Sequence, residues 1–172
     1  MKISYRKLVA ADARQYREIR LESLKLHPES FGASFEEQSK LPKLRFEAAL
    51  EQPADERFMI GAFDRQELIG ICGFLPFVVD YDPRLRNTGT IIQVYVKPAY
   101  RGKRIGLGLV NAVLQEAFKR AAIEQIVLGV TKGNMSAVRV YQQAGFQPYH
   151  TEGGGVEMHE GDLRMIIRKG QQ

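Results

Sequence analysis

Apolar residues recur along this chain with two different periods, which predicts a domain built from both helices and strands. Short runs rich in β-branched and aromatic residues predict strands over 3–7, 57–63, 68–74, 90–96 and 126–130. Apolar residues at helical spacing predict helices over 13–26, 41–50, 109–121 and 136–144, the first capped by Asp12. Residues 146–169 predict two further strands around Gly153-Gly154-Gly155.

The order of these elements indicates how they assemble. It runs strand, helices, three strands, helix, strand, helix and two strands, and no repeat or low-complexity linker interrupts it. This order predicts a mixed α/β (α+β) sheet in one domain over residues 1–170. A chain of 172 residues is long enough to bury a core without disulfides.

Composition narrows the functional classes. The chain has no apolar run of 18 residues, which excludes a membrane span, and its N-terminus lacks the apolar block of a signal peptide. Its single cysteine, Cys72, excludes an internal disulfide and fits a reducing compartment, so we expect a cytoplasmic protein. The net charge of +5 is spread along the chain without a nucleic-acid-binding motif. It is compatible with a phosphorylated cofactor, and we expect neither a nucleic acid nor a membrane partner.

The segment from 90 to 120 carries the chemistry. A strand leads into the glycine-rich turn 101–108 and then into the best predicted helix. The first amides of a helix lack internal partners, and the helix dipole favours negative charge there. Gly102, Gly106 and Gly108 let a ligand approach the backbone, and three basic residues adjoin them. A phosphate or diphosphate is therefore expected, but neither the Walker pattern nor the dinucleotide fingerprint is present.

Residues 94–109 resemble the central motif of the GNAT family of N-acetyltransferases, usually written Q/R-x-x-G-x-G/A. Arg101 fills the first position and Gly106 the last, whereas Arg104 stands where the first glycine is usual. An αR or β conformation would accommodate that arginine. Residues 134–146 resemble the family's N-x-x-A-x-x-x-Y-x-x-x-G-F, and residues 6–37 resemble its acceptor-binding helices.

The resemblance implies a mostly antiparallel sheet of six to seven strands with splayed central parallel strands, and acetyl-CoA as cosubstrate without a metal. The pantetheine arm would lie between strands 92–96 and 126–130, and a backbone amide near Val94 would steady the carbonyl oxygen. Tyr141 would protonate the leaving thiolate, and Asn134 would bond the pantetheine. The implied cofactor-binding residues are Val94, Tyr95, Val96, Arg101, Gly102, Lys103, Arg104, Ile105, Gly106, Leu107, Gly108, Asn134 and Tyr141.

Each of these residues also has a purely structural interpretation. The glycines can mark a tight turn, Tyr141 can be a core tyrosine, and Asn134 can cap the helix that follows. Cys72 lies in an apolar strand and is expected to be inert. The three histidines, His27, His150 and His159, show no ligand spacing and are not expected to bind a metal.

The acceptor is expected to be a primary amine of a small molecule or a protein. Two predicted loops, 31–37 and 80–86, combine aromatic and acidic residues that suit a cationic amine: Phe31, Phe35, Glu36 and Glu37, and Asp80, Tyr81 and Asp82. We assign Glu37 a catalytic role there, because Gln93 on the central strand cannot act as a base. The alternative functions are a non-catalytic acyl-CoA sensor and a basic nucleic-acid-binding module. The oligomeric state is open, and a homodimer is one possibility.

Overall fold

The computed structural model describes residues 2–52, 56–77, 83–149 and 162–171. One seven-stranded sheet runs in the order β1-β2-β3-β4-β5-β7-β6. Its strands are β1 (Ile3–Lys7), β2 (Phe58–Asp64), β3 (Glu67–Leu75), β4 (Thr88–Val96), β5 (Gln125–Thr131), β6 (Gln147–Pro148) and β7 (Asp162–Arg168). Only β4 and β5 pair in parallel, and the other neighbours are antiparallel. The predicted mixed, mostly antiparallel sheet is confirmed.

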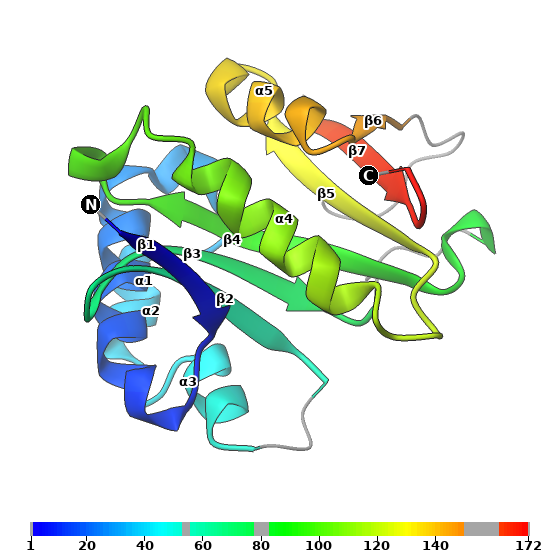
Figure 1. The fold of residues 1–172 in the computed structure, drawn as a ribbon. Coiled ribbons are helices and arrows are strands. Elements are labelled where there is room, and N and C mark those ends of the chain that lie inside the picture. The colour runs from blue at the N-terminus through cyan, green and yellow to red at the C-terminus, as the bar shows by residue number, and fades with distance from the viewer. Residues whose placement is uncertain (1, 53–55, 78–82, 150–161, 172) are drawn as a thin grey trace.

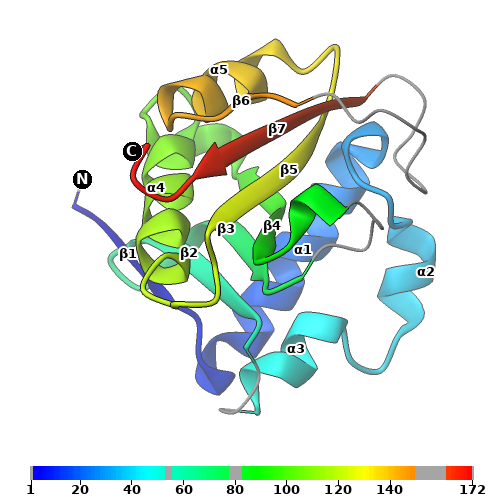
Figure 2. The same cartoon turned by 90° about the vertical axis from the view of Figure 1, so that its right-hand side faces the viewer.

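Helices cover the two faces of the sheet unequally, as the two views in Figures 1 and 2 show. One face carries α1 (Ala13–Leu26), α2 (Phe35–Lys40) and α3 (Arg45–Leu50); the other carries α4 (Ile105–Ala117) and α5 (Met135–Gln143). The faces hold separate apolar cores, one built around α4 and one around α1 and α3. We refer to them below as the α4 face and the α1 face.

The N-terminal helices differ most from the sequence prediction. The segment 31–37, predicted as a loop, contains the start of α2, whose first turn is capped by the Ser34 side chain. The predicted helix over 41–50 begins only at Arg45, because Pro42 keeps the preceding residue extended. Asp12 makes no side-chain cap of α1; its carboxylate instead accepts hydrogen bonds from Arg6 and from the Val9 amide.

Two further elements are shorter than the sequence predicts. Helix α4 ends at Ala117 and not near residue 121, and a turn leads on to β5. Strand β6 is only two residues long. The predicted glycine connection 153–155, together with His150 and His159, lies outside the described residues, as do Asp80, Tyr81 and Asp82.

Candidate active site

A bulge in β4 creates the central feature of the site. Gln93 adopts a positive φ of 55°, and the register between β3 and β4 shifts at this point. The shift changes which residues face which side: Ile91, Val94 and Val96 lie toward the α4 face, whereas Ile92 and Tyr95 lie toward the α1 face. A regular alternation would have placed Val94 and Val96 on the opposite face from Ile91.

Strands β4 and β5 stop pairing before the bulge. Their parallel ladder joins only Thr88, Gly89 and Thr90 to β5, and within the described residues it extends no further. The rest of β4 therefore presents an unpaired edge to the rest of β5, as Figure 1 shows. Unpaired strand edges offer backbone donors and acceptors to an extended ligand. The predicted splay of the central parallel strands is confirmed.

At the end of this gap a row of free amides opens α4. Within the described part of the chain, the amides of residues 102–107 donate no backbone hydrogen bond, whereas Arg101 donates to Pro98 and Gly108 to Arg104. Gly102 has a φ of +76°. Consecutive free amides at a helix start form an anion site because they converge on one point and the helix dipole adds to them.

The residues of this turn have different roles. A Cβ on Gly106 would lie in ordinary van der Waals contact with Val140 and Val96 at 3.9 Å, so Gly106 lies between α5 and β4 and a small side chain could be added there without a clash. A Cβ on Gly108 would clash with the Tyr5 hydroxyl, which makes this glycine a packing contact with β1 instead of an approach point for a ligand. Arg104 is left-handed, with a φ of 59°, so the αR or β conformation expected for it is wrong. This conformation costs a non-glycine residue about 1 kcal/mol.

Two predicted cofactor residues direct their side chains elsewhere. The Tyr95 hydroxyl donates to Glu22 at 2.7 Å on the α1 face. The Arg101 guanidinium donates to the Val96 carbonyl and lies 2.7 Å from His27 Nε2. Both residues can therefore contribute only backbone groups to the α4 face, while their side chains tie the turn to α1.

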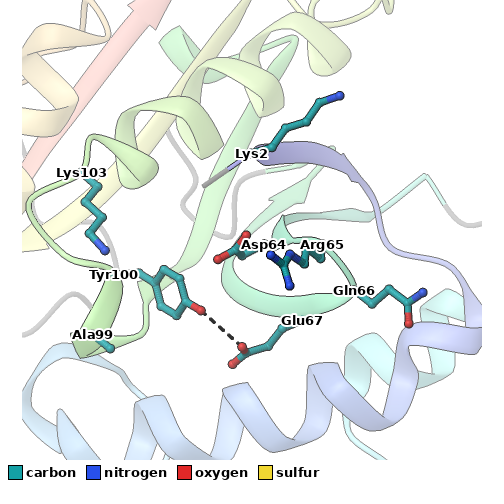
Figure 3. A pocket seen from close by; sticks show the side chains of 8 residues that line it. All are labelled: Lys2, Asp64, Arg65, Gln66, Glu67, Ala99, Tyr100 and Lys103. Carbon is teal, nitrogen blue, oxygen red and sulfur yellow. Dashed lines mark hydrogen bonds between the residues drawn. The ribbon is translucent and has the colours of Figure 1, made fainter.

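The turn is also braced against the β2–β3 hairpin, as Figure 3 shows. Glu67 accepts hydrogen bonds from Lys97 at 2.8 Å and from the Tyr100 hydroxyl at 3.3 Å, and the Lys103 ammonium lies over the Tyr100 ring. An open cleft of about 920 Å³ adjoins these residues. Two acids, Asp64 and Glu67, and three bases, Lys2, Arg65 and Lys103, line this cleft, so its charges nearly balance and do not by themselves select an anion.

Asn134 caps α5, as the purely structural interpretation of this residue predicted. Its Oδ1 accepts hydrogen bonds from the Ala137 amide at 3.2 Å and from the Ser136 hydroxyl at 3.0 Å. The carboxamide nitrogen makes no hydrogen bond within the described residues and remains a donor. Capping and ligand contact are therefore compatible.

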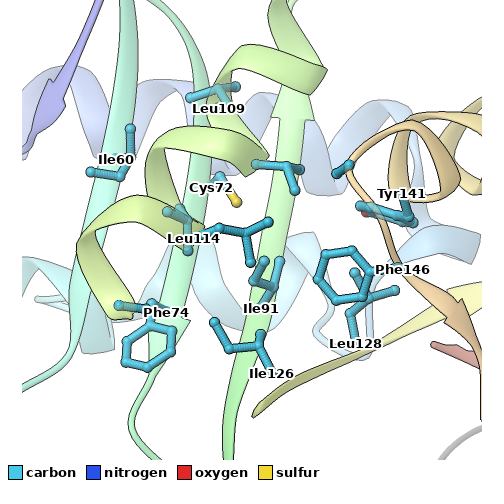
Figure 4. Packing of buried hydrophobic residues seen from close by; sticks show 14 of the residues in the cluster. Ile60, Cys72, Phe74, Ile91, Leu109, Leu114, Ile126, Leu128, Tyr141 and Phe146 are labelled. Atoms are coloured by element: carbon cyan, nitrogen blue, oxygen red, sulfur yellow. The ribbon is translucent and has the colours of Figure 1, made fainter. Parts of the chain in front are cut away.

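Tyr141 reaches into the α4-face core from α5 (Figure 4), where Cys72 and Phe146 also lie. It is 6% exposed, and its ring meets Phe146 edge-on at 6.1 Å. Burial, with a smaller contribution from the Cys72 thiol, raises the pKa of Tyr141 above the usual phenol range. Its hydroxyl has no hydrogen-bond partner among the described residues and is not fully enclosed. Cys72 itself is fully buried, which agrees with its inert assignment.

The α1 face brings polar groups to the opposite side of the bulge. The Tyr16 hydroxyl, which burial keeps protonated by raising its pKa, donates to Gln93 Oε1 at 2.8 Å. Arg20 lies one turn further along α1 and is 6% exposed. Sequence reasoning missed both residues as site candidates. The sequence pattern that could have indicated them is an arginine four residues after Tyr16, on the apolar stripe of the helix, where an arginine is unexpected.

The structure does not bring Glu37 into this cluster directly. Glu37 is exposed in the first turn of α2, and Glu36 beside it pairs with Lys40 at 3.0 Å. Both acids border the surface of the α1 face, so they can act on a ligand there through the field of their charge or through water.

Two negative findings concern ions and membranes. Within the described residues, no group of three or more histidine, cysteine, aspartate or glutamate side chains is placed to hold a metal ion. No helix in the same residues is long and apolar enough to cross a membrane.

Comparisons with known proteins agree with this geometry. The sequence model of the Acetyltransferase (GNAT) family matches residues 16–146. A spermine/spermidine N(1)-acetyltransferase of Bacillus subtilis is 26% identical over 91 residues, which span 51% of this chain and 58% of that protein. The aligned region thus covers less than two thirds of that relative.

Solved structures share the fold over nearly the full chain. The PaiA N-acetyltransferase of Thermoplasma acidophilum in complex with coenzyme A has a TM-score of 0.73 at 24% identity, covering 98% of this chain and 100% of that one. The structure of yncA, a putative acetyltransferase from Salmonella typhimurium with its cofactor acetyl-CoA, has a TM-score of 0.72 at 19% identity, covering 98% and 94%.

Proposed function

This chain belongs to the acetyltransferase (GNAT) family, and we propose that it transfers the acetyl group of acetyl-CoA to a primary amine. The proposal depends chiefly on one observation: the free amides of residues 102–107 lie at the end of the gap between β4 and β5. An anion site beside two unpaired strand edges suits a ligand with a diphosphate and an extended amide-bearing arm. Residues 1–170 form one N-acetyltransferase domain in this proposal.

The residues present fit coenzyme A group by group. The amides of residues 102–107 would bind the pyrophosphate, with Lys103 and Arg104 adding positive charge. Because Gly106 carries no side chain, a phosphate could approach the backbone there. The unpaired edge around Val94 and Val96 would bond the amides of the arm, and the Asn134 carboxamide nitrogen would add a donor from α5. That two of the similar structures carry coenzyme A or acetyl-CoA supports this assignment.

Acetyl-CoA supplies an acetyl group already activated as a thioester, so the protein needs only to position the reactants and manage protons. The acceptor nitrogen forms a bond to the acetyl carbon while the carbon–sulfur bond breaks, and no metal is needed. The cationic amine loses one proton before attack and a second to water after it, Tyr141 donates its proton to the sulfur, and solvent then reprotonates the Tyr141 oxygen. A backbone amide near Val94 would hydrogen-bond the carbonyl oxygen as negative charge develops on it.

Burial of Tyr141 suits this role despite its raised pKa. The raised pKa keeps the hydroxyl protonated at neutral pH, so the acid form is always available. The same surroundings raise the pKa of the Cys72 thiol, which shows how a sulfur anion is destabilised here. A thiolate released at this depth is therefore a stronger base than in water, and the phenol can protonate it.

The acceptor would approach from the α1 face, because the cofactor occupies the gap on the α4 side. Glu37, and Asp80 in the segment outside the described residues, remain candidates for attracting the cationic amine and taking its proton through water. The relative named as a spermine/spermidine acetyltransferase makes polyamines the first amines to test.

The test is an amine panel with acetyl-CoA in which release of free thiol is measured. Polyamines, aminoglycosides, amino acids and peptides with free N-termini cover the acceptor classes. We expect thiol release that depends on one class of amine, together with a matching acetylated product by mass spectrometry. Binding of acetyl-CoA without turnover of any amine would instead identify an acyl-CoA sensor, and absence of binding would disprove the proposal.

A further inference from the structure

Arg20 is a buried charge without a charged partner. It is 6% exposed, its guanidinium lies 4.7 Å from the centroid of the Phe31 ring, and its Nη1 meets the Ser23 hydroxyl at 3.4 Å. That hydroxyl is itself engaged, because it donates to the Arg20 carbonyl at 2.7 Å. No carboxylate pairs with Arg20 within the described residues.

The other buried charges on the same side of the molecule are neutralised. Asp12 pairs with Arg6 at 2.7 Å, and Glu47 pairs with Arg17 at 2.8 Å. An unpaired buried charge costs several kcal/mol, and for this reason proteins rarely keep one without a use for it. Burial also lowers the pKa of Arg20, because protein groups replace only a few of the hydrogen bonds that water would make with the guanidinium. Besides Ser23, the polar side chain of Tyr16 is close enough to interact with the Arg20 charge.

The position of Arg20 connects this charge to the reaction. Tyr16, one turn away on α1, touches the β4 bulge through its hydrogen bond to Gln93. Phe31, the other neighbour, lines a hollow of about 680 Å³ formed with the end of α1 and the start of α2. Arg20 therefore lies between the bulge, beyond which the thioester would lie, and an open hollow on the side from which the acceptor arrives.

We propose that Arg20 binds the carboxylate of the acceptor, so that the acceptor is an amino acid or a similar molecule with a carboxylate near its amine. This inference rests on the proposed function. The planar guanidinium matches a carboxylate in a bidentate pair, and such a pair in a buried site is strong and specific. A polyamine has no anionic group for this position and would bring a second positive charge toward Arg20.

Matched acceptors provide the test. Lysine and cadaverine differ only in the carboxylate, as do ornithine and putrescine, and spermidine represents the polyamines. The wild type, Arg20→Met and Arg20→Lys are compared for kcat/KM on each acceptor. Arg14→Met is the control, because Arg14 lies on the exposed side of α1 and pairs only with Glu18. Binding of each acceptor to the protein loaded with coenzyme A is measured separately by calorimetry, without turnover.

We expect the wild type to prefer each amino acid over its decarboxylated partner, and Arg20→Met to reduce that preference about 10- to 100-fold, through KM. Arg20→Lys should retain part of it, and Arg14→Met all of it. Retained binding of acetyl-CoA by Arg20→Met shows that the variant is folded. Equal use of both partners by the wild type, or an unchanged preference in Arg20→Met, would overturn the inference. If no amine turns over, the proposed function fails, and a calorimetric preference lost in Arg20→Met would still assign the carboxylate site.

Discussion

The two faces of the sheet offer different groups to a ligand. On the α4 face, the available groups are backbone amides at residues 102–107 and an unpaired strand edge, set against an apolar core. On the α1 face, the polar groups are side chains: the Tyr16–Gln93 pair, the Tyr95–Glu22 pair and the buried Arg20. Backbone recognition constrains the glycines and the turn, whereas side-chain recognition can change by single substitutions.

This difference explains why the sequence identifies the cofactor more readily than the acceptor. A turn that frees several amides needs particular backbone angles, and these leave a spaced motif in the sequence. Polar groups that gather on the α1 face come from α1, the segment before α2 and β4, so no short motif records them. Substitutions on one face should therefore affect cofactor binding and those on the other face should affect the acceptor.

A glycine-to-glutamate substitution should change acetyl-CoA binding on the α4 face but not on the α1 face. Gly106→Glu places a negative charge beside the free amides, so acetyl-CoA binding should weaken by more than about 100-fold. The stabilisation that acetyl-CoA gives at 100 times its Kd, about 2.7 kcal/mol, would then disappear from the thermal melt. Gly32→Glu is the matched control, since a side chain at Gly32 meets nothing within 4 Å on the α1 face. Equal cofactor binding by the two folded variants would contradict the assignment.

Tyr141→Phe separates chemistry from binding on the α4 face. The ring and its contact with Phe146 remain, but the proton is lost, so kcat should fall about 10- to 1,000-fold. The Kd for acetyl-CoA should change little. Tyr149→Phe is the control for removal of a hydroxyl, because Tyr149 packs in a separate apolar cluster around Leu85 and Ile166. Wild-type kcat in Tyr141→Phe would assign Tyr141 to packing.

The pH profile tests the same residue without mutation. The protonated phenol is the active form, and burial raises its pKa, so activity is lost only as the pH rises through that elevated value. The kcat should therefore show no alkaline decline below about pH 10, the ordinary phenol pKa. A decline in kcat well below that pH, absent from Tyr141→Phe, would show that the environment does not raise the pKa of Tyr141.

Glu37→Gln should have the smallest effect, because Glu37 is exposed. Loss of one surface charge should raise the KM for a cationic amine about 2- to 5-fold, and added salt should reduce the difference. The rate profile should shift to higher pH, since the amine must then lose its proton to bulk water. Acetyl-CoA affinity should not change. Glu124→Gln, exposed at the start of β5, is the control, and an unaltered KM in Glu37→Gln would remove Glu37 from the acceptor site.

Most strands and both helices of the α4 face could be predicted, because their apolar periods are long and regular. The prediction failed where local polar contacts set the boundaries: Ser34 starts α2 in a segment predicted as a loop, and Pro42 delays α3. It also failed at Arg104, whose left-handed conformation is imposed by the turn between β4 and α4 and not by the residue itself. For Gly108, spacing alone could not distinguish ligand approach from close packing on Tyr5.

The sequence by itself determined the mixed α/β architecture and the glycine-rich turn between the central strand and the helix that follows it. Only the tertiary structure decided which face each of those residues serves. The bulge at Gln93 reverses the alternation along β4, and so places Val94 and Val96 toward α4 and Tyr95 toward α1. The tertiary structure also buries Arg20 without a carboxylate partner among the described residues. The physical reason is that periodicity is a local property, whereas the phase of a strand and the partners of a buried charge depend on segments far apart in the chain.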